Sequence, residues 1–216
     1  MGLSEKVGEV LGARIEARLE EDVRKLTLPQ HIAFIMDGNR RFAWSKAMNT
    51  QTGHRKGKQV LKNVMDWVLE LGIEYMTVYA LSTENLSSRT KKELKGLYDL
   101  YVEGLNEIAE DSKIHENGVK VQIIGHRELL PKRVIDAIEN AEKVTENYSD
   151  FTFTVCLAYG GREEIVRAIR QLAKDHADGN LALEDIDETA VSKRLWTSHM
   201  PDPDLVIRTS GEERIS

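Results

Sequence analysis

Short apolar runs alternate with longer amphipathic segments along most of the chain, and this alternation constrains the fold more than any other feature. The apolar runs are residues 31–36, 75–81, 119–124, 151–158 and 204–208. The segments between them place apolar side chains at helical spacing, over residues 54–71, 91–111, 131–147, 162–176 and 189–196. Strands separated by such helices predict a mostly parallel central sheet, and nearly continuous apolar strands predict helices on both of its faces. We therefore expect an α/β fold with a single domain.

The first part of the chain carries a separate amphipathic pattern. Val7, Leu11, Ile15 and Leu19 recur at helical spacing within residues 4–26, which predicts an N-terminal helix. Its polar face mixes both charges, which favours packing of the apolar stripe on the protein body over a basic helix that lies on a membrane surface. We therefore divide the chain into an N-terminal amphipathic helix, residues 1–28, and one α/β domain, residues 29–216.

Charge and cysteine content narrow the class of protein. The 216 residues carry a net charge of −6, whereas a dedicated nucleic-acid binder is expected to be basic, so we expect no nucleic-acid partner. Any anionic ligand must therefore be held by a local cluster of arginine and lysine. The single cysteine, Cys156, lies in an apolar run and is expected to be a buried structural thiol. The sequence shows no signal-peptide pattern and no membrane span, which together with the lone cysteine predicts a cytoplasmic protein.

The turns that follow the predicted strands carry the most informative side chains, because ligands of parallel sheets bind beyond the carboxyl ends of the strands. The first strand is followed by Asp37, Gly38, Asn39, Arg40, Arg41 and Phe42. An aspartate offers a hard oxygen ligand for Mg²⁺ beside the positive charge of two arginines, so this turn predicts a diphosphate site with Asp37 as metal ligand. The alternative is an Asx-type turn with solvated arginines. A second arginine pair, Arg208 and Arg214, follows the fifth strand at the same edge and favours the ligand site.

Nucleotide and zinc sites lack their sequence patterns. The sequence has no Gly-x-x-x-x-Gly-Lys-Ser/Thr motif and no Gly-x-Gly-x-x-Gly motif after a strand. The run at residues 53–58 is similar to the first motif, but its spacing is wrong and no strand directly precedes it. The six histidines are scattered without zinc-ligand spacing. His54 is of interest because it lies at a predicted helix start near the first turn, where it either donates a hydrogen bond to phosphate or faces solvent.

Several of these segments together resemble the cis-prenyltransferases, the undecaprenyl diphosphate synthase family. The matching runs, in family order, are residues 31–43 (HIAFIMDGNRRFA), 53–54, 79–85 (YALSTEN), 123–125, 158–162 and 204–216 (DLVIRTSGEERIS). The resemblance implies a cis-prenyltransferase-like catalytic domain that extends an allylic prenyl diphosphate with isopentenyl diphosphate by cis head-to-tail condensation, making a polyprenyl diphosphate. It also implies a requirement for Mg²⁺, a homodimer, and an apolar tunnel beside helix 91–111, which carries Leu97, Tyr98, Tyr101 and Leu105.

The resemblance also implies the roles of single residues. Asp37 resembles the metal-linked aspartate that assists departure of the diphosphate, and Phe42 is expected near the first isoprene unit. The expected cradle of the allylic diphosphate is Gly38, Asn39, Arg40, Arg41 and His54. Ser82 and Asn85 are expected near the condensing carbons, with a part in the proton relay, and Thr83 and Glu84 are expected substrate contacts. The expected binding set for isopentenyl diphosphate is Arg208, Arg214 and Ser216, and Arg89 resembles the arginine that follows the family's Ser-x-Glu-Asn motif.

The sequence departs from the family pattern at a few positions. Thr50 stands where many bacterial members have an arginine that grips the allylic diphosphate, and a hydroxyl does not replace that contact at equal strength. Arg40 replaces a glycine of the bacterial form and partly compensates. Leu81 and Leu86 stand where aromatic residues are usual; Thr50 and Leu86 remain expected substrate contacts. One additional residue lies between Asn85 and Arg89. The sequence ends before the tail in which members usually carry a glutamate that helps to hold the metal, so we expect that tail to be missing.

These departures leave other functions open. The first is an irregular prenyltransferase of the same family, which joins prenyl units in another way or uses another acceptor. The second is a non-catalytic partner subunit of a prenyltransferase complex, although such subunits tend to lose the aspartate that is present here as Asp37. The third is a phosphate-binding module without chemistry. For the catalytic reading we also expect peripheral membrane contact through the apolar product.

Overall fold

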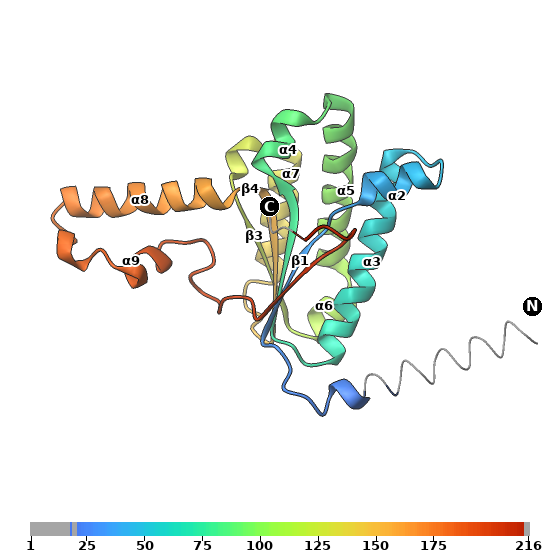
Figure 1. The fold of residues 1–216 in the computed structure, drawn as a ribbon, viewed down its shortest axis with the longest axis horizontal. Coiled ribbons are helices and arrows are strands. Elements are labelled where there is room, and N and C mark those ends of the chain that lie inside the picture. The colour runs from blue at the N-terminus through green and yellow to red at the C-terminus, as the bar shows by residue number, and fades with distance from the viewer. Residues whose placement is uncertain (1–17, 19–20, 214–216) are drawn as a thin grey trace, which may run out of the picture.

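The computed structural model describes residue 18 and residues 21–213, and its centre is one five-stranded parallel sheet (Figure 1). The strands are β1 (His31–Ile35), β2 (Tyr75–Ser82), β3 (Val119–Ile124), β4 (Phe151–Tyr159) and β5 (Leu205–Arg208). Their order across the sheet is β3-β4-β2-β1-β5. All four neighbouring pairs are parallel, with His31 opposite Tyr75 and Ile32 opposite Leu205. The predicted single-domain α/β fold is therefore confirmed, because every predicted apolar run forms a strand of this sheet.

Helices lie on both sides of the sheet (Figure 1). The longer helices are α3 (Thr50–Glu70), α5 (Lys91–Glu110), α7 (Lys132–Val144) and α8 (Gly161–Ala177). The shorter ones are α2 (Asn39–Ser45), α4 (Thr83–Ser88), α6 (Ser112–Glu116) and α9 (Glu188–Ser192), with 3₁₀ turns at η1 (Arg127–Leu129) and η2 (Leu183–Asp185). Figure 1 shows α2, α3 and α5 on one side of the sheet, whereas α8 extends away from the other side. The site described below lies on the side of α2, α3 and α5.

Side-chain caps explain where two of these helices begin. The Asn49 side chain accepts a hydrogen bond from the Thr52 backbone N–H, so α3 starts at Thr50 and not at the predicted His54. The Thr90 side chain caps α5 in the same way, accepting from the Glu93 N–H. Short helices α4 and α6 were not predicted, because five or six residues carry too little apolar periodicity to be recognised.

The core lies between the sheet and the helices. Met76, Val78 and Leu81 of β2 are almost completely buried, as expected for a strand covered on both faces. Cys156 of β4 is 3% exposed, which confirms that its thiol is buried. His31 is buried as well, and its ring nitrogens lie 2.7 Å from the Pro201 carbonyl oxygen and 2.8 Å from Thr77 Oγ1. The contact with Pro201 attaches the segment before β5 to β1, and the contact with Thr77 links β1 to β2.

The predicted N-terminal helix, residues 4–26, lies mostly outside the described residues. Where the chain is described, residue 18 and residues 21–23 are helical. Arg24 Nη2 lies 2.5 Å from the Glu70 carbonyl oxygen at the end of α3. Within the described part of the chain, no helix is both long and apolar enough to cross a membrane.

Candidate active site

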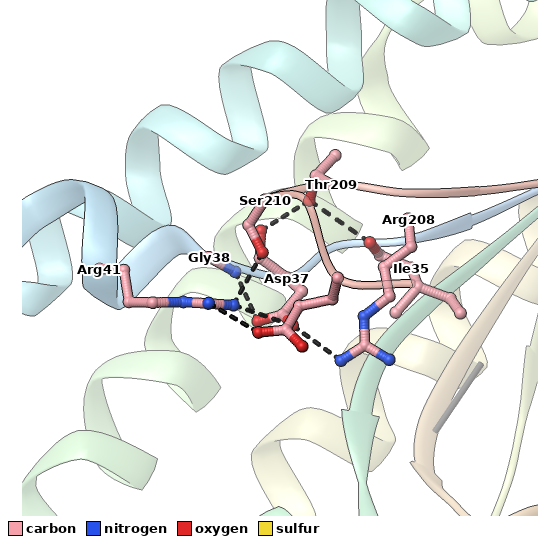
Figure 2. Close-up of polar contacts among 8 residues, drawn as sticks. Ile35, Asp37, Gly38, Arg41, Arg208, Thr209 and Ser210 are labelled. Atoms are coloured by element: carbon pink, nitrogen blue, oxygen red, sulfur yellow. Dashed lines mark hydrogen bonds and ion pairs between the residues drawn. The ribbon is translucent and has the colours of Figure 1, made fainter. Parts of the chain in front are cut away.

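The turns after β1 and β5 are packed against each other, and Gly38 is the residue that makes this possible. Gly38 has φ 88°, in the left-handed region that favours glycine, and it is the N-cap of α2. A Cβ built on it would lie 2.4 Å from Ser210 Cβ. No larger residue fits without displacing the β5 turn. The backbone therefore brings together two charged segments that are about 170 residues apart in sequence (Figure 2).

The Asp37 carboxylate lies between two arginines at this junction (Figure 2). Its Oδ2 is 2.8 Å from Arg208 Nη2 and 3.2 Å from Arg41 Nη2, and its Oδ1 accepts a 2.6 Å hydrogen bond from the Gly38 N–H. Partial burial works to raise the pKa of Asp37, but the hydrogen bonds from Arg208 and Gly38 and the charge of Arg41 outweigh it and lower that pKa. Asp37 is therefore a carboxylate at neutral pH.

Further hydrogen bonds hold this carboxylate and its partners in place. Thr209 Oγ1 donates to the Asp37 backbone carbonyl over 2.6 Å, while the guanidinium of Arg41 contacts Glu212 Oε1 at 2.7 Å and Ser210 Oγ at 2.8 Å. Arg41 therefore links α2 to the β5 turn and keeps its positive charge at the mouth of the site. Glu212 was not singled out from the sequence, although it lies four residues after Arg208 in the same turn.

A second charged cluster, formed by side chains of α2, α3, α5 and the end of α4, surrounds Glu93. Arg89 Nη1 lies 2.5 Å, Arg40 Nη1 3.8 Å and His54 Nε2 4.0 Å from Glu93 Oε1. The pKa of His54 is lowered to about 4, chiefly by burial and then by the positive charges of Arg89 and Arg40, while the negative charge of Glu93 acts in the opposite direction. The imidazole is therefore neutral at pH 7.

Two atoms of this second cluster lack partners. Among the described residues, His54 Nε2 and Arg89 Nε are buried without a hydrogen-bond partner. Buried polar atoms are normally satisfied, so unpartnered ones beside an open cavity indicate where a ligand supplies the missing acceptor. Arg89 therefore lies at the cavity despite the additional residue that precedes it.

Asn39 and the glycines of α3 explain how α2 approaches α3 so closely. A Cβ at Gly53 would lie 2.3 Å from the Asn39 carbonyl oxygen, and a Cβ at Gly57 would lie 2.6 Å from Asn39 Nδ2. The two glycines are one helical turn apart and so occupy one face of α3. The glycine spacing that superficially resembles a nucleotide-binding loop is therefore a helix-packing surface, which confirms that it is not a phosphate loop.

The turn after β2 contributes Ser82 and Asn85. Ser82 Oγ caps α4 by accepting a 3.0 Å hydrogen bond from the Asn85 N–H, and both residues line the cavity together with Glu84. Thr83 instead donates a hydrogen bond to Glu163 Oε1 at 3.0 Å, and Leu86 packs against the core.

Four of the expected substrate contacts lie outside the lining of this cavity: Phe42, Thr50, Thr83 and Leu86. Phe42 is 44% exposed on α2. Thr50 is the first residue of α3, directly after its cap. Arg214 and Ser216, expected to bind isopentenyl diphosphate, lie outside the described residues.

A cavity of about 930 Å³ connects these polar groups to the interior of the protein. It passes from Asp37, His54 and Asn85 downwards between α3, α5 and the sheet. Its inner walls are apolar and include Leu61, Met65, Val78, Leu97, Leu100, Tyr101, Leu105, Ile108 and Phe153. Of the four residues expected along the tunnel, Leu97, Tyr101 and Leu105 line it, whereas Tyr98 packs against the core.

A cationic mouth above a long apolar cavity suits a ligand with an anionic head and a hydrocarbon tail. The family model of the undecaprenyl diphosphate synthases matches residues 35–216 of this chain. The chain belongs to the cis-prenyltransferases. It is a prenyl transferase that carries out cis head-to-tail condensation, in agreement with the names of its relatives.

Relatives of this cis-prenyltransferase include archaeal enzymes named tritrans,polycis-undecaprenyl-diphosphate synthase (geranylgeranyl-diphosphate specific). The Pyrococcus abyssi enzyme is 47% identical over 201 residues, which cover 93% of this chain and 76% of the relative. The Thermoplasma volcanium enzyme is 38% identical over 216 residues, covering all of this chain and 83% of the relative. Among solved structures, lavandulyl diphosphate synthase from Lavandula x intermedia in complex with dimethylallyl diphosphate has a TM-score of 0.81 and 34% identity, covering 87% of this chain and 80% of that one.

Proposed function

We propose that this cis-prenyltransferase uses geranylgeranyl diphosphate as its allylic substrate, extends it with isopentenyl diphosphate and requires Mg²⁺. The observation that carries the proposal is the continuity of the cavity, which joins a mouth containing Arg40, Arg41 and His54 to an apolar interior. The names of the archaeal relatives, which specify geranylgeranyl diphosphate, support the choice of substrate. A long starter also suits a cavity at the upper end of the usual size for ligand sites, which is about 1,000 Å³.

The two charged clusters suggest where each diphosphate binds. The allylic diphosphate is proposed to lie over Asn39, Arg40 and Arg41, within reach of the unpartnered His54 Nε2 and Arg89 Nε. The isopentenyl diphosphate is proposed to lie towards Arg208, with Arg214 and Ser216 beyond the described residues. Two diphosphates close together repel each other, so arginines from both turns are needed to offset that repulsion. In this arrangement Arg40 supplies positive charge at the allylic diphosphate that Thr50 cannot supply.

The donor set at Asp37 fits Mg²⁺ held mostly by its substrate. The described residues contain no group of three or more His, Cys, Asp or Glu side chains that could hold a metal by themselves. Mg²⁺ is commonly bound by one or two carboxylates together with substrate phosphates and water, so a single ionised carboxylate at the phosphate site is sufficient. Asp37 is the residue proposed to hold it. When bound, the ion supplies positive charge that stabilises the departing diphosphate.

The side chains of this protein have separate tasks in the proposed reaction. Arg40, Arg41 and the first turn of α2 bind the allylic diphosphate and stabilise the charge that it gains as its bond to carbon breaks. Asn85 lines the cavity and is proposed to orient the isopentenyl unit for attack on the allylic carbon. Ser82 is proposed to assist the loss of a proton from that unit. The apolar walls of the cavity are proposed to keep water away from the positive charge that develops on the allylic carbon.

We also propose that the enzyme is a homodimer built on β5 and α8. Leu205, Val206 and Ile207 form an edge strand and are 45%, 45% and 38% exposed, while Ile165 and Ile169 on α8 are 50% and 53% exposed. An exposed apolar edge strand and helix face are unfavourable in water and are commonly covered by a second subunit. Sedimentation of the protein tests this. Val206→Lys should yield monomers, and a monomeric unmodified protein would contradict the proposal.

The apolar product suggests where the enzyme works. We propose a cytoplasmic protein that contacts a membrane through the prenyl chain it releases. Flotation of the enzyme with lipid vesicles, with and without substrates, tests this contact. Co-flotation that depends on turnover supports the proposal, and flotation that is equal without substrates contradicts it.

Incubation with labelled isopentenyl diphosphate tests the function directly. The purified enzyme receives dimethylallyl, farnesyl or geranylgeranyl diphosphate with Mg²⁺, and mass spectrometry identifies the products. Geranylgeranyl diphosphate should yield a ladder of C5 additions most efficiently. A single coupled product without a ladder would instead indicate an irregular prenyltransferase, and binding of pyrophosphate without any product would indicate a module without chemistry.

The variant Asp37→Asn tests the catalytic assignment. It should lower the rate by about 10²–10³ without a change in fold, since the amide keeps the shape but loses the charge. Asp136→Asn, in an exposed ion pair with Lys132 on α7, is the matched control and should keep full activity. Unchanged turnover of Asp37→Asn would indicate that the chemistry lies elsewhere, and inactivity of both proteins with every substrate would favour a non-catalytic subunit.

A further inference from the structure

A row of ion pairs closes the outer side of the cavity, where α3 faces α5 and α6. Lys58 Nζ lies 2.9 Å from Glu103 Oε1 and 2.8 Å from Glu107 Oε1. The stem of Lys58 crosses α5 beside Gly104, since a Cβ built on that glycine would lie 3.7 Å from Lys58 Cε. Lys58, Gly104 and Glu107 all line the cavity. Its wall is therefore polar on this side, although the other walls are apolar.

The deep end of the cavity carries another cross-helix pair. Lys62 Nζ lies 3.1 Å from Asp111 Oδ2, and both residues line the cavity. One turn further along α3, Asp66 Oδ1 lies 3.1 Å from Lys113 Nζ. Around them, Met65 and Ile114 are buried and complete the lining with apolar surface. A charged pair therefore lines the cavity at the end far from its mouth, beside apolar surface.

Two hydrogen bonds hold the Asp111 side chain in place. Its Oδ1 accepts a hydrogen bond from the Lys113 N–H at 3.1 Å and so caps α6, while its Oδ2 pairs with Lys62. The Asp111 side chain is 27% exposed and that of Lys62 is 52% exposed, compared with 54% for Asp136 and 77% for Lys132 in the surface pair on α7. Asp111 therefore has two separate tasks, since Oδ1 caps the helix and Oδ2 holds α3 at a fixed distance.

We propose that the Lys62–Asp111 pair is the end stop of the cavity and sets the length of the prenyl product. The proposal rests on the proposed function, because it needs a chain that grows into this cavity. A prenyl tail that reaches the pair meets two charges that it cannot solvate. Further extension would have to separate the pair or remove water from Asp111, the less exposed of the two, and the loss of solvation of a carboxylate beside apolar surface is unfavourable. Between the mouth and this pair, Lys58 with Glu103 and Glu107 closes the outer wall of the cavity.

Two conservative variants remove one charge each. Asp111→Asn keeps the helix cap, because asparagine caps as well as aspartate, and Lys62→Met keeps an unbranched apolar stem of similar length. Each should shift the product ladder from geranylgeranyl diphosphate towards longer chains, by one or more C5 units. The double variant should shift it no further than the single ones, since both break the same contact. The rate of the first addition should stay within about twofold of the unmodified enzyme, because the mouth is unchanged.

The surface pair on α7 provides the matched control. Lys132→Met and Asp136→Asn remove charges of the same kind from an exposed pair outside the cavity lining, and should leave the ladder unchanged. Salt gives an independent perturbation, because about 1 M NaCl screens partly exposed pairs. High salt should lengthen the products of the unmodified enzyme but not those of Lys62→Met. An unchanged ladder in both single variants, shorter products, or additive shifts in the double variant would overturn the proposal.

Binding of unreactive prenyl ligands separates this proposal from the proposed function. Thio-linked prenyl diphosphates of increasing length should bind more tightly with each added C5 unit until the tail reaches the pair, after which the gain stops. In Asp111→Asn the gain should continue for at least one further unit. A plateau at the same length in both proteins would overturn the end stop. Failure of the enzyme to elongate any substrate would overturn the proposed function, while this binding series would still decide where the cavity ends.

Discussion

Acid should destabilise this protein through His54, the buried imidazole between α3 and α5. Burial and two nearby arginines hold the pKa of His54 at about 4 in the folded protein, whereas an unfolded histidine titrates near 6.5. The folded state therefore binds fewer protons than the unfolded state between these values. With this sign, stability is complete above about pH 7 and is lost as the pH falls through 6.5 towards 4. Below about pH 4 both states are protonated and the loss is complete.

The size of the effect follows from the same two pKa values. Only 13% of the His54 side chain is exposed, so solvent screening is modest. A shift of this size corresponds to about 3 kcal/mol in total, of which about 2 kcal/mol should be lost between about pH 8 and about pH 5. That loss is a large part of the stability of an ordinary domain, which is about 5–15 kcal/mol.

Urea unfolding of the unmodified protein and of His54→Gln at both pH values measures this loss. Glutamine does not titrate, so its variant should lose about 2 kcal/mol less than the unmodified protein on acidification. Other groups with shifted pKa values, such as His199, are present in both proteins and cancel in the comparison. Equal losses in the two proteins would refute the reasoning, because they would mean that His54 is as readily protonated in the folded state as in the unfolded one.

The same imidazole should report ligand binding. An anion placed in the proposed diphosphate cradle offsets the positive charge of Arg40 and Arg89 and favours the imidazolium form. The pKa of His54, followed by NMR, should therefore rise when pyrophosphate and Mg²⁺ are added. An unchanged pKa at saturating pyrophosphate would place the anion away from this histidine.

Three other positions give further expected outcomes. Gly38→Ala should lower the free energy of unfolding by about 1–2 kcal/mol through its left-handed backbone alone, and should reduce activity because its Cβ displaces Ser210; urea unfolding and a rate assay check both. Cys156 should resist iodoacetamide in the folded protein, since burial raises the pKa of its thiol to about 12; rapid labelling without denaturant would contradict its burial. Glu164→Leu should lower the free energy of unfolding by about 2–5 kcal/mol, because it removes the acceptor of the Tyr159 hydroxyl and of the Trp196 backbone N–H. A Glu164→Gln variant that is equally unstable would point to the charge instead.

Several features of this protein are determined by short stretches of sequence. The runs that became β2, β3 and β4 were recognisable because each is rich in apolar residues over the length of a strand; β4 is buried along nearly its whole length, whereas β2 and β3 largely alternate buried and half-buried residues. Gly38 after an apolar run predicts a tight turn, and a charged strand end beside it predicts an anion site. The buried state of Cys156 likewise follows from its neighbours. These properties are local, so hydrophobic periodicity and residue chemistry suffice to predict them.

Helix starts and short helices were less predictable, because they depend on single hydrogen bonds. The Asn49 cap moved the start of α3 to Thr50, and Ser82 Oγ caps the start of α4 by accepting a hydrogen bond from the Asn85 N–H. The consequence for the site is direct. Thr83 was expected at the substrate but turns towards Glu163, since the first turn of α4 places neighbouring side chains in different directions.

Only the tertiary structure decided which charges meet. Arg208 contacts Asp37 because β5 lies beside β1 at the edge of the sheet, and Lys62 contacts Asp111 because α3 and α5 lie on the same face. Strand order and helix placement result from packing between segments far apart in the chain, and no local pattern encodes them. The sequence by itself therefore determined an anion site on a parallel sheet, whereas the packing of α3, α5 and the sheet determined the depth of the cavity and the charged pair at its end.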